Sequence, residues 1–207
     1  MAGWKLFDDV LPEPPDMLAS RGWMDLERQP GFTQRADMVA GLVGLIAALR
    51  PDMRTVTDLG CGDGSMMKRF PSTLKAWGYE LGAGDVAEGR ARGLDVRQAD
   101  IIHGDLEYGD LLVASEVLEH LGNPQSFLQL LPDRLLIVSS PSKETGDWHN
   151  AIPAWAWDMD GYRELLETSG WRVLYHTDCD GGWNTFAGVE GPQRFQAAVC
   201  ARDMAAA

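Results

Sequence analysis

The stretch Thr55-Val56-Thr57-Asp58-Leu59-Gly60-Cys61-Gly62-Asp63-Gly64 decides the fold of this chain. Its β-branched and apolar beginning is typical of a short buried strand. The glycines that follow allow the backbone to turn tightly and to approach a ligand closely. In an open α/β sheet, ligands lie beyond the carboxyl ends of the strands. The stretch therefore predicts the first strand of such a sheet, with a ligand at the turn 60–64.

Strand-like and helix-like segments alternate along the rest of the chain. Strands are predicted at 55–59, 73–81, 94–98, 110–115, 134–139, 171–176 and 195–200. Helices are predicted at 33–49 (capped by Thr33), 65–70, 86–92, 124–131 and 158–169. Strands separated by helices imply parallel βαβ units, whereas the last two strands should form an antiparallel hairpin. The predicted fold is α/β: a Rossmann-like, seven-stranded mixed sheet, mostly parallel, with helices on both faces.

Charge and composition narrow the class of partner. The 207 residues carry a net charge of −13, from 18 basic and 31 acidic side chains. Such a charge disfavours a long nucleic acid duplex or an anionic membrane surface. The apolar stretch 38–49 is too short to span a bilayer, no signal segment is visible, and three cysteines without a CxxC pair suggest free thiols. We expect a soluble, cytoplasmic protein that acts on a small molecule.

Acidic residues close the second and third predicted strands. A carboxylate at Glu80 can accept hydrogen bonds from both ribose hydroxyls. Asp100 can accept from an adenine amino group, and Ile101 can lie against the ring. The chain has no Gly-x-x-x-x-Gly-Lys-Ser/Thr motif, which excludes a P-loop. Because Asp63 inside the turn would repel a pyrophosphate, an adenosyl ligand with a positive charge fits better.

Four motifs in this order resemble those of class I methyltransferases that use S-adenosylmethionine (SAM). They are Asp58 to Gly64, Gly78-Tyr79-Glu80, Gln98-Ala99-Asp100-Ile101 and Ser115-Glu116-Val117-Leu118-Glu119-His120. The resemblance covers residues 33–202, and it departs from the family at Gly82-Ala83-Gly84, where polar residues are usual. It implies that the turn holds the methionine end of SAM, Glu80 the ribose and Asp100 the adenine. The implied cofactor-binding residues are Asp58, Gly60, Cys61, Gly62, Glu80, Leu81, Asp100, Ile101, Ser115 and Glu116.

The Glu-x-x-Glu-His part of the fourth motif suggests two alternatives. If a helical turn begins at Glu116, then Glu116 and Glu119 share a face. Together with His120 and the later His149 they could hold Mg²⁺ or Mn²⁺. The pattern is similar to one in small-RNA 3′-terminal 2′-O-methyltransferases, and it also occurs in ubiquinone-pathway O-methyltransferases and in relatives with no known metal. Alternatively, Glu119 and His120 only orient the loop, and His149 or His120 serves as a general base.

Tryptophans gather where this fold usually forms its acceptor pocket. Trp148, Trp155 and Trp157 follow the fifth predicted strand. Their rings would suit a flat acceptor or a stacked base, and core packing beneath a long loop is the alternative. Because Trp155 and Trp157 alternate, one of them is expected to face the pocket. Trp183 either borders this site or closes the last hairpin.

We divide the chain into an N-terminal arm, 1–32, and a methyltransferase domain, 33–207. Prolines block regular elements in the arm. N-terminal extensions often cover the SAM site in relatives, so Trp4, Trp23 and Phe32 are candidates for a lid. His103 and His176 are expected at the surface.

The favoured function is transfer of a methyl group from SAM to an O or N atom of a small molecule. The second alternative is metal-assisted 2′-O-methylation of an RNA end. The third, of another class, is a SAM-binding module without catalysis. The sequence leaves the acceptor and the oligomeric state open.

Overall fold

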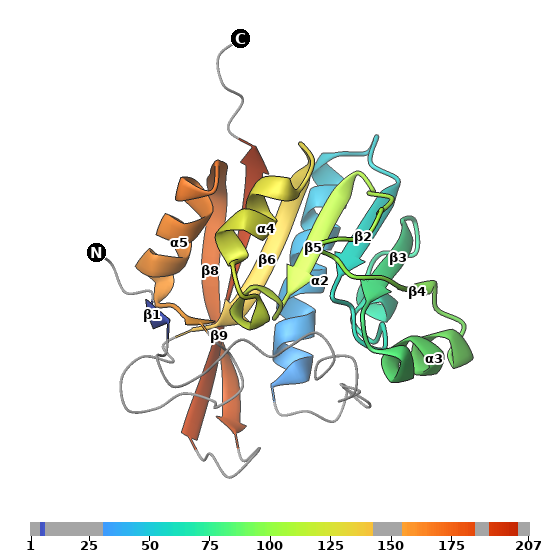
Figure 1. Cartoon of the computed structure of the whole chain (residues 1–207), viewed down its shortest axis with the longest axis horizontal. Coiled ribbons are helices and arrows are strands. Elements are labelled where there is room, and N and C mark those ends of the chain that lie inside the picture. Colours follow the sequence, from blue (N-terminus) through green and yellow to red (C-terminus); the bar gives the residue numbers. More distant parts are fainter. Residues whose placement is uncertain (1–4, 7–30, 143–154, 185–190, 203–207) are drawn as a thin grey trace.

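A computed structural model of the protein describes residues 5–6, 31–142, 155–184 and 191–202 (Figure 1). Its main sheet has seven strands in the order β4-β3-β2-β5-β6-β9-β8. The first five of these strands along the chain are mutually parallel, and β9 runs antiparallel to both β6 and β8. The strands are β2 (Thr55–Leu59), β3 (Lys75–Glu80), β4 (Val96–Gln98), β5 (Leu111–Ser115), β6 (Leu135–Pro141), β8 (Trp171–Asn184) and β9 (Gly191–Arg202). The predicted α/β fold with an antiparallel C-terminal hairpin is confirmed.

Helices cover both faces of this sheet. Buried residues of α2 and α3 belong to the core on one face, and those of α4 and α5 belong to the core on the other. Figure 1 shows α4 and α5 on one side of the sheet and α2 on the other. The helices are α2 (Phe32–Leu49), α3 (Ala83–Ala91), α4 (Pro124–Leu130) and α5 (Met159–Thr168), with single 3-10 turns at η2 (Met67–Arg69) and η3 (Leu118–His120).

The start of α2 differs from the sequence prediction. Gly31 is its N-cap, in the left-handed region at φ 73°, and no side chain caps the helix, so Thr33 does not have the predicted role. A Cβ at Gly31 would lie 2.6 Å from the Phe195 ring, so this position requires glycine both for its φ and for space. Phe32 is the first helical residue and is buried in the core rather than placed as a lid.

Helix α2 is long and apolar enough to cross a membrane by length and composition alone, with 18 residues and a mean hydropathy of 1.3. It is longer than the apolar stretch 38–49 considered in the sequence. Its buried residues include Val39, Val43 and Ile46, which pack with strand residues in the first core cluster. A helix that packs on a sheet in this way is a core helix.

The largest differences in extent from the prediction lie at 65–70 and in the C-terminal hairpin. The expected helix at 65–70 is only the single turn η2, and Phe70 is already in extended backbone, the conformation favoured before the proline at 71. Strands β8 and β9 continue well past 171–176 and 195–200, and they pair from Trp171–Arg202 to Asn184–Gly191 with two register shifts. Cross-strand pairing here overrides the low strand preference of the aspartates and glycines at 178–182.

A small second sheet joins part of the arm to the domain. β1 (Lys5–Leu6) pairs antiparallel with β7 (Trp155–Ala156). The predicted lid residues Trp4 and Trp23 lie outside the described residues.

Candidate functional site

The glycine turn lies at the point where the strand order reverses. β2 has β3 on one side and β5 on the other, and both neighbours are parallel to it. Ligands in open α/β sheets bind outside the carboxyl ends of the strands at such a point. Gly60 has φ 73°, and its N–H donates to the Tyr79 carbonyl at 2.8 Å. A Cβ at Gly60 would lie 2.6 Å from Val117 Cγ2, so the turn and the loop after β5 are in close contact.

Glu80 is held at the tip of β3 by the turn itself. Its Oε2 accepts from the Gly62 N–H at 3.0 Å, and its Oε1 accepts from the Gly82 N–H at 2.8 Å. The side chain is buried. A carboxylate has about four lone-pair directions, so each oxygen can accept one more hydrogen bond. This geometry suits the predicted contact with the two ribose hydroxyls.

Asp58 is a second buried carboxylate beside the turn. Burial, and then the negative charge of Glu80, raise the pKa of Asp58 to about 7. The same burial, together with Asp58 and Glu80, raises the pKa of the Cys61 thiol well above its usual value. Two carboxylates close together favour a positively charged ligand. Cys61 is therefore a neutral, buried neighbour of the turn, with its backbone N–H bonded to the Tyr79 carbonyl at 3.0 Å.

Asp63 has a different role from the one assigned on the sequence. Its Oδ1 accepts from the Ser65 N–H at 2.9 Å, and its Oδ2 accepts from Arg92 Nη1 at 2.8 Å. Arg92 therefore compensates the charge of this buried acid, so Asp63 does not determine whether the site prefers a positively or a negatively charged ligand. The preference of the turn for a cation rests on Asp58 and Glu80. The sequence separates Asp63 and Arg92 by a whole strand and most of a helix, which is why the pair was missed.

The predicted adenine end follows β4. Asp100 accepts hydrogen bonds from the Ile102 N–H at 2.8 Å and from the His103 N–H at 3.4 Å. The exposed His103 ring also lies 2.9 Å from Asp100 Oδ2, through Nδ1. The surface position predicted for His103 is correct, and its contact with the proposed adenine acceptor was not foreseen. Ile101 packs against the second core cluster, and Leu81 follows β3 with a carbonyl that accepts from Gln98 Nε2 at 3.2 Å.

A polar network lies at the carboxyl ends of β5 and β6. Ser115 Oγ and Ser139 Oγ are 2.7 Å apart, and Ser139 Oγ donates to Glu116 Oε1 at 3.0 Å. Arg35 Nη1, from α2, lies 3.6 Å from Glu116 Oε2. Burial raises the pKa of Glu116, and the charge of Arg35 and the Ser139 hydrogen bond oppose the rise. Glu116 is the only residue other than glycine among the described residues that has a positive φ, at 57°. Its backbone is therefore strained.

Arg35 and Ser139 were not foreseen as site residues. A signal for Arg35 was present, because it lies one turn before Val39 and three residues after Phe32, on the stripe that packs in the core. A charged residue on an otherwise apolar stripe calls for a partner. Nothing in the local sequence marks Ser139, because its contact depends on the pairing of β5 with β6.

The four proposed metal ligands are not brought together by the part of the chain that the structure describes. The helical turn begins at Leu118, so Glu116 lies before it with left-handed backbone and does not share its face with Glu119. Within the described ranges, no group of three or more His, Cys, Asp or Glu side chains could hold a metal ion. Glu119 is buried, and His120 is half-buried at the end of η3. His149 lies outside the described residues.

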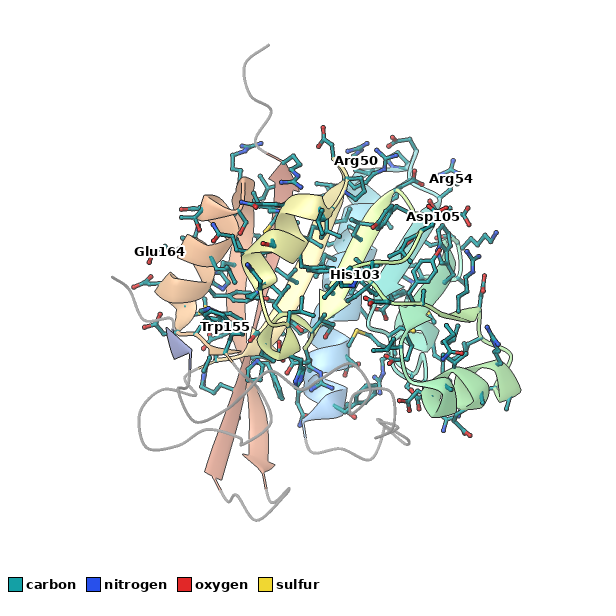
Figure 2. All side chains as sticks on the ribbon, viewed as in Figure 1. Arg50, Arg54, His103, Asp105, Trp155 and Glu164 are labelled. Atoms are coloured by element: carbon teal, nitrogen blue, oxygen red, sulfur yellow. The ribbon has the colours of Figure 1, made fainter. Side chains whose placement is uncertain are left out.

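Of the tryptophans, Trp157 belongs to the core, and Trp155 packs against that core with its ring stacked on the Trp157 ring, the two centroids lying 6.2 Å apart. Trp157 is 0% exposed and packs on Tyr162, with ring centroids 5.4 Å apart. The half-buried Trp155 donates from Nε1 to the Leu121 carbonyl at 2.8 Å, beside η3 (Figure 2). Trp148 lies outside the described residues, as does the Trp183 side chain. The expected surface residue His176 is half-buried, with Nε2 3.1 Å from Gln196 Oε1.

Solved structures share this fold. The N-methyltransferase NodS from Bradyrhizobium japonicum WM9, in complex with S-adenosyl-L-homocysteine (SAH), is 14% identical, with a TM-score of 0.61 over 90% of this chain and 94% of that one. Magnesium protoporphyrin IX methyltransferase ChlM from Synechocystis PCC 6803, with bound SAM, is 18% identical, with a TM-score of 0.57 over 88% and 87%. The cyclase SpnF is 16% identical, with a TM-score of 0.57 over 79% and 81%. These likenesses show the methyltransferase fold.

No curated protein matches the chain. The sequence profile of one family matches residues 41–150, which is more than half of the 207 residues. The matched range contains the glycine turn, Glu80, Asp100 and the polar network residues Glu116 and Ser139. The chain belongs to the family of the methionine biosynthesis protein MetW.

Proposed function

We propose that this protein is a cytoplasmic SAM-dependent methyltransferase that methylates an O or N atom of a small molecule. The observation that carries the proposal is the pair of buried carboxylates, Asp58 and Glu80, at the glycine turn where the strand order reverses. The rise in the pKa of Asp58 comes from burial and Glu80, and no basic side chain of the described residues opposes it. A site with this charge suits the ammonium and sulfonium groups of SAM.

The residues of the chain would bind and align the reactants. SAM supplies a methyl group on a positively charged sulfur, which passes to the acceptor atom as the carbon–sulfur bond breaks and SAH is left. The turn and Asp58 hold the methionine end, Glu80 the ribose, and Asp100 with Ile101 the adenine. His120, at the end of η3, is the first candidate for the general base that takes a proton from the acceptor. His149, which lies outside the described residues, is the second candidate.

The proposal includes no metal ion, because the described candidate ligands do not suit one. Glu116 lies against the Arg35 cation, which would repel a divalent ion, and its Oε1 is bonded to Ser139. A small-molecule acceptor also agrees better with the net charge of −13 than an RNA end does.

Calorimetric titration with SAM and SAH tests the cofactor site. The wild type should bind both, and Asp58→Asn and Glu80→Gln should each weaken SAM binding by about ten- to hundredfold, as expected for a lost charge-assisted contact. Asp105→Asn, an exposed acid, is the matched control and should leave the affinity unchanged (Figure 2). Undetectable SAM binding by the folded wild type would refute the proposal.

Activity needs its own test, because a cyclase shares this fold and fold alone does not choose the chemistry. Labelled SAM incubated with a broad metabolite panel should give a methylated product and SAH. Tight SAM binding without transfer to any acceptor would instead support a SAM-binding module.

A further inference from the structure

A cavity lies at the amino end of the sheet, away from the glycine turn. Its volume is about 550 Å³, and its wall includes Met53 before β2, Asp110 before β5 and Leu135 at the start of β6. Because β2, β5 and β6 are parallel, their carboxyl ends all lie at the other end of the sheet, where SAM is proposed to bind. A strand of five residues is about 17 Å long, so the two sites are separate. A cavity of this size can hold a small molecule.

Four arginines gather in the wall of this cavity: Arg50, Arg134, Arg172 and Arg202. Arg50, at the upper end of the molecule in Figure 2, is neutralised by Asp52, with Nε–Oδ1 and Nη2–Oδ2 distances of 3.2 and 3.1 Å. The other three form no ion pair with a carboxylate of the described residues. They come from three segments: the loop before β6, and the strands β8 and β9. In a protein whose net charge is −13, such a group of unpaired cations makes this surface locally attractive to anions.

The acids in the wall do not cancel this charge. Asp110 Oδ2 accepts from the N–H groups of Arg54 and Thr55, at 2.8 and 3.0 Å, and from Thr55 Oγ1 at 2.8 Å. The Arg54 hydrogen bond, followed by those of Thr55, lowers the pKa of Asp110 and holds its carboxylate against the backbone. Asp133 is the remaining acid of the wall, so two carboxylates oppose the three unpaired guanidiniums. The cavity therefore keeps an excess of positive charge.

Arg202 is a cation that its neighbours hold in a fixed position. Its Nη1 and Nη2 donate to carbonyl groups at the carboxyl ends of α4 and α5, at 2.6 to 3.2 Å. Its Cζ lies 4.4 Å from the centroid of the Trp171 ring. Because these partners carry no net charge, the positive charge of Arg202 remains uncompensated beside the cavity.

Arg134 and Arg172 have N–H groups available to a ligand. Both residues are exposed. Arg134 donates from Nη1 to the Asp133 carbonyl at 3.0 Å, and Arg172 forms no side-chain hydrogen bond with the described residues. The guanidinium of an arginine can donate to two oxygens of a phosphate or a carboxylate at once. These two side chains can therefore contact an anion directly, while Arg202 supplies a fixed charge.

We propose that this cavity binds the phosphate group of a small phosphorylated molecule. Arg134 and Arg172 donate hydrogen bonds to the phosphate oxygens, and the charge of Arg202 stabilises the anion. A phosphate ester has three terminal oxygens and close to two negative charges, so it satisfies more of these donors than a carboxylate does. Met53 and Leu135 give the wall an apolar part for the rest of the ligand. The inference does not depend on the proposed methyltransferase function.

Ligand-observed NMR with methyl phosphate and acetate as probes, each with and without SAH, tests the inference. The wild type should bind methyl phosphate about tenfold or more tightly than acetate, to the same extent with and without SAH. The double variant Arg134→Gln/Arg172→Gln should weaken methyl phosphate binding by about tenfold or more. Arg163→Gln is the matched control, because Arg163 is an exposed arginine of α5 that pairs with Glu167 and lies outside the wall of the cavity. It should leave the binding unchanged.

Unchanged methyl phosphate binding in the folded double variant would overturn the inference, and so would undetectable binding by the wild type at low salt. Displacement of methyl phosphate by SAH would also overturn it, because the anion would then lie at the SAM site. Equal affinities for acetate and methyl phosphate would contradict the assignment of the site to phosphate. Failure of the wild type to bind SAH would instead remove the proposed function, while the probes measured without SAH still report on the cavity.

Discussion

The two halves of the carboxyl edge of the sheet are built differently. The half around β2 and β3 is made largely of backbone: glycines in the left-handed region, and a Glu80 carboxylate held by two N–H groups. The half around β5, β6 and β9 is made of side chains from distant segments, with Arg35, Glu116 and Ser139 in one network. The first half follows from a short stretch of sequence. The second half exists only after the helix and three strands have assembled.

The largest expected effect comes from a change in the half of the site around β2 and β3, at the glycine turn. Gly60→Ala forces a side chain into φ 73° and places its Cβ 2.6 Å from Val117, so we expect a loss of about 2–4 kcal/mol in the free energy of unfolding. Urea denaturation measures it. Gly41→Ala is the control, since Gly41 lies within α2 with open space around its Cβ, and this change should stabilise by up to about 1 kcal/mol. Equal effects at the two positions would contradict the role of the turn.

Removal of the cation beside Asp63 is expected to have the next largest effect. Arg92→Met leaves this fully buried acid without its 2.8 Å partner and should cost about 2 kcal/mol in unfolding free energy. Adding Asp63→Asn should recover part of the loss, because the buried group is then neutral. If the two changes are simply additive in a double-mutant cycle, the pair does not have the structural role described here.

The pH dependence of SAM binding tests the negative charge of the half around β2 and β3. The pKa of Asp58 is raised to about 7, so below that pH the Asp58 carboxyl of the free protein is neutral. A cation binds the protein more tightly when this carboxyl is ionised. Binding should therefore tighten as pH rises through 7, by about tenfold from pH 6 to pH 8. Calorimetry at several pH values measures this trend. Asp58→Asn should bind more weakly and should lose this rise, and a rise as steep as that of the wild type would assign the titration to another group.

The smallest expected effect concerns the strained backbone of Glu116, in the half of the site around β5, β6 and β9. Glu116 has φ 57°, so Glu116→Gly should be about 1 kcal/mol more stable than Glu116→Ala. Both changes remove the same contacts, and their difference isolates the strain. At Glu164 on α5 the order should reverse, with alanine more stable by about the same amount (Figure 2). Thermal and urea unfolding of the four variants measure these differences.

The same contrast explains which features the sequence could predict. Strand β2, the glycine turn and the position of Glu80 depend on local residues, and the structure places them as expected. The network around Arg35 and the compensation of Asp63 by Arg92 depend on contacts between distant segments, and neither was foreseen. The premise that a helical turn begins at Glu116 was wrong, because the turn begins at Leu118, two residues after that glutamate.

The rotation of helix α2 about its axis determines both how the helix packs in the core and where Arg35 points. The burial of Phe32 and Val39 in the core fixes which way the helix faces, and Arg35 on the same stripe then faces Glu116. Each residue advances an α-helix by about 100°. One inserted or deleted residue between Gly31 and Arg35 would turn the guanidinium away from Glu116 if the core kept its register. Length changes in this first turn should therefore be selected against in evolution much more strongly than substitutions at its exposed positions.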